Sequence, residues 1–330
     1  MDMDFFSGKS VLITGGTGSL GKELTRALLR DTEIRRVAIF SRDELKQHEM
    51  RSEFGNDSRL RWFLGDIRDL SRLEIALNGI DFVIHAAALK QVDTGEYNPM
   101  EFVKTNVLGS QNVIEASIKS KVSRVLALST DKASSPINLY GATKLTADKL
   151  FIAANNYSQG YGTALSVVRY GNVMGSRGSV IPVFQNLAKL GKPIPITDRR
   201  MTRFWIGIEE AAIFVLESLI IMKGGELYVP RIPSMRIIDL AEAVAPNSQV
   251  IEIGIRPGEK LHEEMISKED MRRTKKISNS RLVVLPVVTE WDYKEPSGEA
   301  MHSVSAYSSD SNDLWMEKEE LSRIISPIKE

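Results

Sequence analysis

Five side chains that can move protons lie within a short stretch of the chain: Thr130, Asp131, Lys132, Tyr140 and Lys144. Tyr140 and Lys144 have Y-x-x-x-K spacing, which on a helix places both side chains on the same face, one turn apart. A lysine so placed is expected to lower the pKa of the phenol and to hold a nicotinamide ribose, so that the tyrosine takes a proton from a sugar hydroxyl while hydride leaves the same carbon. Asp131 and Lys132 add an acid and a base that a simple dehydrogenase does not need. The pattern predicts oxidation of a substrate, further chemistry on it and return of the hydride.

The composition excludes several classes of function. Lysine plus arginine and aspartate plus glutamate both total 43 among the 330 residues, so no overall field favours nucleic acid or an anionic membrane. The lack of cysteine excludes disulfides, thiolate metal sites and a cysteine nucleophile, and four histidines are too few to predict a metal site. The first residues lack the pattern of an export signal, and the apolar stretch at 211–222 is too short to span a bilayer. We expect a cytoplasmic protein with no nucleic-acid or membrane partner.

Short apolar runs alternate with helical stretches in the first half of the chain. The runs that predict strands are residues 11–13, 37–40, 60–64, 82–84, 125–128 and 165–168. Runs that are apolar on both faces and separated by helices predict an α/β fold with a doubly wound, Rossmann-like parallel sheet covered on both sides. Ligands of such a fold bind at the carboxyl ends of the strands, near the switch in strand order.

After residue 172 the pattern breaks into shorter pieces separated by prolines. Helices near 208–222 and 237–243 and strands near 227–229 and 250–255 predict a smaller lobe that selects the substrate. We therefore expect a dinucleotide-binding domain at 1–172 and a substrate-binding lobe at 173–330, with some later segments returning to the first domain. Residues 288–313 are polar and predict a surface linker, followed by a docking helix at 316–325.

A glycine turn follows the first predicted strand. Residues 11–21 (V-L-I-T-G-G-T-G-S-L-G) lead from the strand into a helix at 19–30. Gly15, Gly18 and Gly21 suit the tight turn, the approach of backbone to a pyrophosphate and helix–strand packing, and the start of the helix faces the phosphates. The sequence therefore predicts a dinucleotide site.

The end of the second strand favours NADP over NAD. Ser41 and Arg42 suit a 2′-phosphate, whereas NAD-binding chains place a carboxylate there. Asp43 is expected to cap the helix at 44–54, and Asp66 to receive the adenine amino group or to cap another helix. The expected cofactor-binding residues are Gly15, Thr17, Gly18, Ser19, Leu20, Gly21, Ser41, Arg42, Asp43, Lys46, Gln47, Asp66, Ile67, Ala86, Ala87, Ala88, Leu128, Ser129, Tyr140, Lys144 and Val173.

Longer motifs resemble those of one family. They are residues 41–47 (S-R-D-E-L-K-Q), 85–90 (H-A-A-A-L-K), 128–133 (L-S-T-D-K-A), 138–144 (N-L-Y-G-A-T-K), 169–179 (R-Y-G-N-V-M-G-S-R-G-S) and 256–262 (R-P-G-E-K-L-H). The chain resembles the UDP-N-acetylglucosamine 4,6-dehydratase (inverting) family of extended short-chain dehydrogenase/reductases, most loosely at 271–300. Members of that family catalyse the first step of pseudaminic acid synthesis, and pseudaminic acid is used in flagellin glycosylation. The C5-retaining dehydratases have glutamate where this chain has Lys132.

The resemblance implies a C5-inverting 4,6-dehydration of UDP-N-acetylglucosamine to UDP-2-acetamido-2,6-dideoxy-β-L-arabino-hexos-4-ulose with tightly bound NADP. It implies that Tyr140 takes the 4-hydroxyl proton, Lys144 sustains the phenolate and Thr130 hydrogen-bonds its oxygen, while hydride leaves C4. Neutral Lys132 then removes the C5 proton and protonated Asp131 gives a proton to the departing 6-hydroxyl, after which hydride returns at C6. Lys132 is also expected to return the C5 proton from the opposite face. Burial is expected to favour the neutral forms of Lys132 and Asp131.

Several residues are expected to hold the sugar and its diphosphate. Lys90 and Asn172 follow strand ends, Arg177 begins an anion-binding turn, and Arg256 suits a diphosphate. The nucleotide-sugar contacts implied by the resemblance are Arg177, Gly178, Ser179, Val180, Thr197, Met201, Arg256, Glu259, Tyr307, Ser308, Ser309 and Asn312.

Three alternatives remain open from the sequence. A nucleotide-sugar 4-epimerase shares the loop, Tyr140 and Lys144 but does not need Asp131 and Lys132 to expel water. A capsule-type C5-inverting dehydratase is the second alternative, and a non-catalytic NADP-binding protein is the third, although it would be expected to lack Tyr140 or Lys144. The preference for an acetamido group rests on the resemblance. We expect a homo-oligomer, a dimer or an assembly up to a hexamer, with the helix at 99–119 as the partner face.

Overall fold

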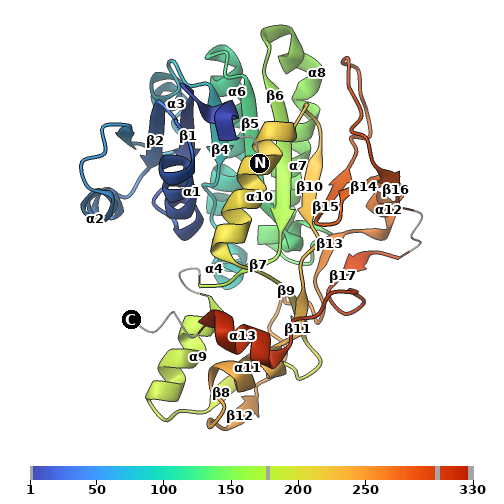
Figure 1. The fold of residues 1–330 in the computed structure, drawn as a ribbon. Coiled ribbons are helices and arrows are strands. Elements are labelled where there is room, and N and C mark those ends of the chain that lie inside the picture. The colour runs from blue at the N-terminus through green and yellow to red at the C-terminus, as the bar shows by residue number, and fades with distance from the viewer. Residues whose placement is uncertain (1–2, 176–178, 302–304, 326–330) are drawn as a thin grey trace.

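A sheet of ten strands forms the centre of the larger part of the molecule (Figure 1). In this computed structural model, which describes residues 3–175, 179–301 and 305–325, the strand order is β16-β14-β15-β10-β6-β5-β4-β1-β2-β3. Neighbouring strands from β10 to β3 run parallel, and β15, β14 and β16 add an antiparallel edge. The strands are β1 (Ser10–Thr14), β2 (Arg36–Ser41), β3 (Leu60–Leu64), β4 (Phe82–His85), β5 (Arg124–Thr130), β6 (Ala164–Tyr170), β10 (Leu227–Pro230), β14 (Thr274–Ser278), β15 (Arg281–Val284) and β16 (Glu299–Ala300). The expected doubly wound α/β fold is confirmed.

Helices cover both faces of this sheet. One face packs against α3 (Leu70–Ala76), α6 (Gly109–Lys119) and α7 (Leu139–Ala153). The other packs against α1 (Ser19–Asp31), α2 (Glu44–Phe54) and α10 (Ile208–Ile221). Because both faces are buried, every residue of β1 and β10 is buried, which explains the apolar run at the centre of β1 and the mostly apolar sequence of β10. Shorter helical segments are η1 (Met3–Phe6), α4 (Val92–Tyr97), α5 (Pro99–Phe102), the π-helical η2 (Val103–Leu108), η3 (Asp131–Ala133), α8 (Asn155–Ser158) and η4 (Gln159–Tyr161).

Two segments that the sequence assigns to the smaller lobe belong to the large sheet instead. Helix α10 packs beside α1, and β10 pairs in parallel with β6. Both elements are apolar on nearly all sides, so they need a position covered from two directions, and the large sheet provides it.

The smaller lobe has a core of its own. It contains α9 (Val180–Lys189), α11 (Ile237–Val244), α13 (Lys318–Ile325), β8 (Ile194–Ile196) and β12 (Val250–Glu252), which lie below the large sheet in Figure 1. The expected C-terminal docking helix is present as α13, packed against α11. Between the two parts lie the sheet β11-β9-β7 and the pair β13–β17, formed by β7 (Asn172–Val173), β9 (Thr202–Ile206), β11 (Ser234–Arg236), β13 (Glu264–Ile266) and β17 (Tyr307–Ser308), with α12 (Lys268–Met271) following β13. None of the helices within the described ranges has the length and apolar character needed to cross a bilayer.

Candidate active site

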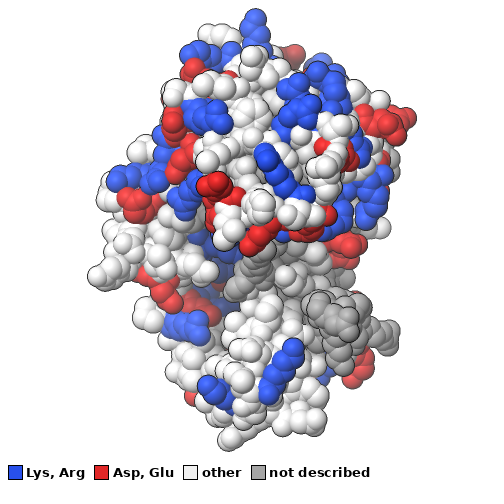
Figure 2. Space-filling model, turned by 90° about the vertical axis from the view of Figure 1, so that its left-hand side faces the viewer, with Lys and Arg blue, Asp and Glu red and all other residues white. Residues whose placement is uncertain are grey.

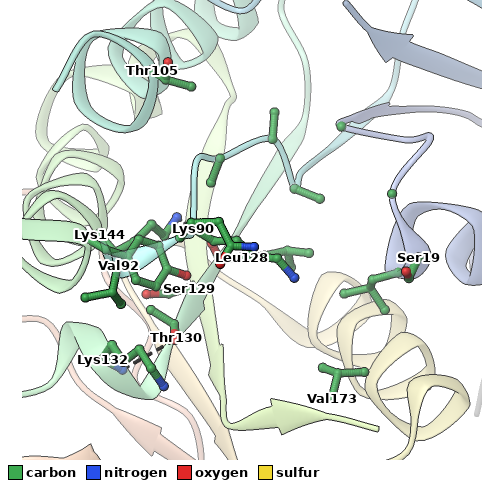
Figure 3. Close-up of a pocket in the computed structure, with 18 of the residues that line it drawn as sticks. Ser19, Lys90, Val92, Thr105, Leu128, Ser129, Thr130, Lys132, Lys144 and Val173 are labelled. Atoms are coloured by element: carbon green, nitrogen blue, oxygen red, sulfur yellow. Dashed lines mark hydrogen bonds between the residues drawn. The ribbon is translucent and has the colours of Figure 1, made fainter. Parts of the chain in front are cut away.

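A cavity of about 890 Å³ lies at the carboxyl ends of the parallel strands, where the large sheet meets the smaller lobe. Figure 2 shows a hollow between the larger and the smaller parts of the molecule, with basic and acidic side chains inside it. In Figure 3, Ser19 and Val173 lie across the cavity from Thr130 and Lys132. The cavity therefore joins the expected dinucleotide loop to the expected catalytic side chains.

The glycine turn fits a dinucleotide in its backbone geometry. Gly15 has φ +65°, and a Cβ atom there would lie 2.8 Å from the Cα of Ala87. Gly18 precedes α1 without a side-chain cap, and the first residues of that helix, Ser19, Leu20 and Gly21, line the cavity. A helix start that no side chain caps offers its amides and positive dipole end to a phosphate group.

The end of β4 is held against this turn by a neutral histidine. His85 is buried, with Nδ1 2.8 Å from the Thr14 hydroxyl and Nε2 3.2 Å from the Ser110 hydroxyl. Burial, with a smaller contribution from the charge of Lys144, lowers the pKa of His85 to about 3. The residues after it, Ala86, Ala87 and Ala88, line the cavity, as expected for a wall that a cofactor approaches closely.

The far end of the cofactor half carries the residues expected to select the dinucleotide. Ser41, Arg42, Lys46 and Asp66 line the cavity, and one guanidinium nitrogen of Arg42 lies 3.8 Å from a carboxylate oxygen of Asp66. Asp43 also lines the cavity.

Asp43 and Gln47, which follow β2, have structural roles at this end of the cavity. The prediction that Asp43 caps α2 is confirmed, because its carboxylate accepts a 3.0 Å hydrogen bond from the Lys46 amide. Gln47 is absent from the cavity lining: it is buried and donates to the Ser41 and Phe63 carbonyls, so it fixes the strand ends from behind.

The candidate catalytic residues come from two adjacent elements. Strand β5 ends at Thr130 and continues into the short turn η3, which carries Asp131 and Lys132. The Thr130 hydroxyl donates to Asp131 Oδ1 at 2.9 Å, and Lys132 Nζ donates to the same oxygen at 3.1 Å. Helix α7 begins after Asn138, whose side chain accepts from the Gly141 amide at 2.8 Å, and this cap sets the position of Tyr140.

The electrostatics of Tyr140 and Lys144 differ from the expectation. Burial raises the pKa of Tyr140 to about 12, although Lys132 and a hydrogen bond with Thr130 act to lower it. Burial also lowers the pKa of Lys144, against the opposing charge of Asp148, and its Nζ donates to the Leu128 carbonyl at 2.7 Å. The expected lowering of the phenol pKa by Lys144 is thus not present in this structure, since Lys144 is directed to a backbone carbonyl and is itself desolvated.

The state of Lys132 is a second correction. Burial opposes its charge, but the carboxylates of Asp131 and Glu263 outweigh burial and raise its pKa above the ordinary lysine value. Lys132 Nζ lies 3.1 Å from Asp131 Oδ1 and 3.1 Å from Glu263 Oε1. Lys132 is therefore an ammonium in the free protein, whereas burial alone would have made it neutral.

Sequence reasoning missed Glu263 and Arg203, which both line the cavity. Glu263 directly follows the R-P-G-E-K-L-H motif, and Arg203 is a lone charge in the fully buried strand β9. A charged residue inside an otherwise apolar strand is the signal that could have drawn attention to Arg203. Other lining residues that were not predicted are Phe40, Gly65, Gln91, Val92, Asp93, Thr105, Tyr170, Gly171, Pro257 and Gly258.

Helix α7 touches the turn η3 at a glycine. A Cβ atom at Gly141 would lie 2.1 Å from the Lys132 carbonyl oxygen. We expect Gly141→Ala to lower the free energy of unfolding by about 1–3 kcal/mol, the usual cost of overpacking, and to slow turnover because Asp131 and Lys132 must move. Denaturant unfolding and turnover measure both effects. Gly160→Ala is the matched control, since nothing lies within 4 Å of its added Cβ, and equal stability of the two variants would contradict the close contact.

The expected substrate residues divide into three groups. Those that line the cavity are Lys90, Lys132, Asn172, Ser179, Val180, Arg256 and Glu259. Arg177 and Gly178 lie outside the described residues. The remaining residues, which are buried or partly buried behind the cavity wall and do not line it, are Thr197, Met201, Tyr307, Ser308, Ser309 and Asn312.

The third group supports the site from behind instead of touching the cavity. The Ser309 hydroxyl accepts from the Glu263 amide at 3.0 Å, and the Ser309 amide donates to the Glu263 carbonyl at 2.8 Å. The Tyr307 ring packs 4.9 Å from that of Phe204, and Asn312 donates to the Ile232 carbonyl at 2.9 Å. The tail thus fixes the backbone that carries Glu263.

Comparison with known proteins places the chain in a family. The model of the polysaccharide biosynthesis protein family matches residues 11–284. A UDP-N-acetylglucosamine 4,6-dehydratase (inverting) from Campylobacter jejuni subsp. jejuni serotype O:23/36 (strain 81-176) is 51% identical over 329 residues, 97% of this chain and 98% of that protein. The chain belongs to the polysaccharide biosynthesis protein family. The expected resemblance to the inverting dehydratases is confirmed by the same comparison.

Two solved structures and a further relative are also similar to this chain. The structure of Pen from Bacillus thuringiensis has a TM-score of 0.90 and 37% identity, covering 98% of this chain and 99% of that one. A dTDP-glucose 4,6-dehydratase from Streptomyces venezuelae, solved with NAD bound, has a TM-score of 0.71 and 25% identity over 76% of this chain and 86% of that one. A UDP-glucose 4-epimerase from Rickettsia akari (strain Hartford) is 45% identical over 276 residues, 81% of this chain and 80% of that protein. The bound NAD of the second structure is consistent with a nicotinamide cofactor.

Proposed function

We propose that this protein is a hydro-lyase that converts UDP-N-acetylglucosamine to UDP-2-acetamido-2,6-dideoxy-β-L-arabino-hexos-4-ulose by 4,6-dehydration with inversion at C5. The observation that carries the proposal is the convergence of Tyr140, Lys144, Asp131 and Lys132 on one cavity beside the glycine turn. The 51% identity to an inverting dehydratase along nearly the whole chain supports it. We further propose that the product enters pseudaminic acid synthesis.

The chain's own residues supply the proton transfers. Tyr140 takes the proton of the 4-hydroxyl while its own phenol proton passes through the Thr130 hydroxyl to Asp131, to which Thr130 donates a hydrogen bond. Asp131 gives a proton to the departing 6-hydroxyl, while Lys132 removes the proton from C5, which the C4 ketone makes acidic. A bound nicotinamide dinucleotide supplies the hydride acceptor at C4 and the hydride donor at C6. The proton lost from the 4-hydroxyl thus ends in the water that leaves.

Isotope labelling tests the proposal directly. With substrate deuterated at C4, the product should lose one water and carry the label in its C6 methyl group, as measured by mass spectrometry and NMR. An L-arabino configuration at C5 is expected. A product without label in the methyl group would contradict the proposed hydride path.

The same experiment separates the second candidate function, a nucleotide-sugar 4-epimerase. The 45% identical relative named UDP-glucose 4-epimerase favours it. An epimerase would leave the substrate mass unchanged and keep deuterium at C4. Asp131 and Lys132, ion-paired at 3.1 Å in the cavity, support the dehydratase because epimerisation at C4 expels no water. A product of unchanged mass would favour the epimerase.

We propose NADP as the dinucleotide, held by the residues expected from the sequence that line the cavity. Arg42 would hold the 2′-phosphate by a charge-assisted hydrogen bond. Arg42→Ala is therefore expected to weaken NADP binding about ten- to a hundredfold and to leave NAD binding nearly unchanged, as measured by calorimetry with each dinucleotide. Arg68→Ala is the matched control, because Arg68 pairs with Asp66 at 2.8 Å without lining the cavity. Equal loss for both dinucleotides would contradict this role.

The remaining assignments are also proposals. We propose that residues 1–172 bind the dinucleotide, that residues 173–330 bind the sugar nucleotide, and that α10, β10, β14 and β15 return to the first unit. We also propose a cytoplasmic homo-oligomer that pairs through the segment 99–119, where Met100 and Leu108 are exposed.

A further inference from the structure

Glu263 is a buried carboxylate that the proposed function leaves without a role. It is 2% exposed, lines the cavity and lies just before β13. Its Oε1 forms a 3.1 Å ion pair with Lys132, and its Oε2 is buried without a hydrogen-bond partner among the described residues. A carboxylate oxygen held in this way is costly to bury, so a specific use is expected.

Lys132 has two carboxylate neighbours where one would balance its charge. Asp131 Oδ2 is also buried without a partner among the described residues, so each carboxylate has one free oxygen. Only one of the two acids needs to be protonated for the three groups to be neutral together. Asp131 must hold a proton for the departing 6-hydroxyl. Of the two carboxyl groups beside Lys132, Glu263 is therefore the one that can accept a proton.

A lysine must lose the extra proton of its ammonium before it can remove the proton from C5. Lys132 is an ammonium in the free protein, so its proton needs an acceptor within the cavity. Glu263 Oε1 is 3.1 Å away, which is within reach of direct proton transfer.

We propose that Glu263 is the proton partner of Lys132 in the dehydration step. This inference rests on the proposed function. The proton of the Lys132 ammonium moves to Glu263 Oε1, which leaves a neutral amine and a neutral carboxylic acid. The amine then takes the C5 proton as the 6-hydroxyl departs with a proton from Asp131, and afterwards delivers a proton to the opposite face of C5, which gives the inverted configuration. Glu263 finally returns its proton to Lys132, so the cycle closes without a co-reactant.

The surroundings of Glu263 suit such an exchange. Its backbone is held by Ser309, from the C-terminal tail, through hydrogen bonds of 3.0 and 2.8 Å. Arg203 contributes positive charge nearby, but its guanidinium already donates to the carbonyls of Thr202, Lys260 and Leu261 and to Glu259. The charges of Asp131, Lys132 and Arg203 face Glu263, and burial raises the pKa of its carboxyl. The carboxyl is thus fixed in place beside Lys132, with its neutral form favoured by burial.

Glu263→Gln tests the proposal because glutamine keeps the shape and one acceptor oxygen but takes up no proton. We expect loss of water to slow by about 10²- to 10⁴-fold, the usual effect of removing a proton-transfer group. Oxidation at C4 should stay close to the wild-type rate. After rapid quenching, mass spectrometry should therefore find a sugar that has lost two hydrogens but no water.

The pH profile separates proton transfer from a structural role. In Glu263→Gln the proton of Lys132 must leave to solvent, so the rate of water loss should rise about tenfold per pH unit below the lysine pKa. The wild type should lack this rise. A variant that slows both half-reactions equally at every pH would overturn the proposal.

Two further variants complete the design. Glu264→Gln is the matched control, since the neighbouring Glu264 does not line the cavity, and it should behave as wild type. Glu263→Asp keeps a carboxyl group; it should slow water loss more than C4 oxidation and keep the wild-type pH profile, and it decides the question if the glutamine variant fails to fold. If wild type itself releases no water from UDP-N-acetylglucosamine, the proposed function fails. If wild type does so and Glu263→Gln matches it, only the role of Glu263 fails.

Discussion

Lys132→Ala is expected to slow loss of water by about 10²- to 10⁴-fold, as for other groups that transfer a proton in a transition state. The reason is that the Lys132 amine lines the cavity beside both Asp131 and Glu263, where it can remove the C5 proton. Binding of NADP and oxidation at C4 should persist, since the dinucleotide loop and the Tyr140 phenol stay in place, although removal of the Lys132 charge removes one influence that lowers the pKa of Tyr140. Rapid quenching with mass spectrometry should detect the 4-keto sugar that retains its 6-hydroxyl.

The controls for this experiment address charge and folding. Lys132→Arg keeps a cation between the two carboxylates, but a guanidinium does not lose its proton at neutral pH, so it should also fail to release water. Lys149→Ala removes an exposed lysine from α7 and should leave the rate unchanged. Turnover of Lys132→Ala near the wild-type rate would show that Lys132 is not the C5 base.

Tyr140→Phe is expected to stop the reaction one step earlier. Without the phenol oxygen the proton of the 4-hydroxyl has no acceptor beside Thr130, and C4 oxidation should slow by about 10²- to 10⁴-fold. Neither the 4-keto sugar nor the product should accumulate, and C4 deuterium should remain in the recovered substrate. The two variants thus differ in what they accumulate, which a general loss of folding would not produce.

The stability of Tyr140→Phe should be close to that of the wild type. Its ring stays in place, and the change removes the hydrogen bond between the Tyr140 hydroxyl and Thr130. Tyr157→Phe, at a residue that is 52% exposed, is the matched control and should react normally. Accumulation of the 4-keto sugar in Tyr140→Phe would assign the first proton transfer to another group.

The sequence by itself determined the elements whose information is local. Apolar runs predicted β1 to β6 because a strand covered on both faces is rich in apolar residues on both; only β3, at the edge of the sheet, has exposed positions within its run. The glycine turn predicted the start of α1, and the Y-x-x-x-K spacing predicted that Tyr140 and Lys144 lie on one helix facing one cavity. These features depend on backbone geometry within a few residues, so the spacing of residue types along the sequence is enough to predict them.

The tertiary structure alone decided which distant side chains share the cavity and which charges they carry. Glu263 and Arg203 reach the cavity because two segments far along the chain, β9 and the residues just before β13, lie beside it, and β13 contacts η3. No local periodicity of the sequence predicts these contacts. The same contact raises the pKa of Lys132, where burial by itself would have lowered it. Tyr307, Ser309 and Asn312 likewise do not line the cavity, and they contact the backbone and side chains around it instead. The physical reason is that electrostatic energies depend on distances between atoms in space, and these are fixed only once the chain has folded.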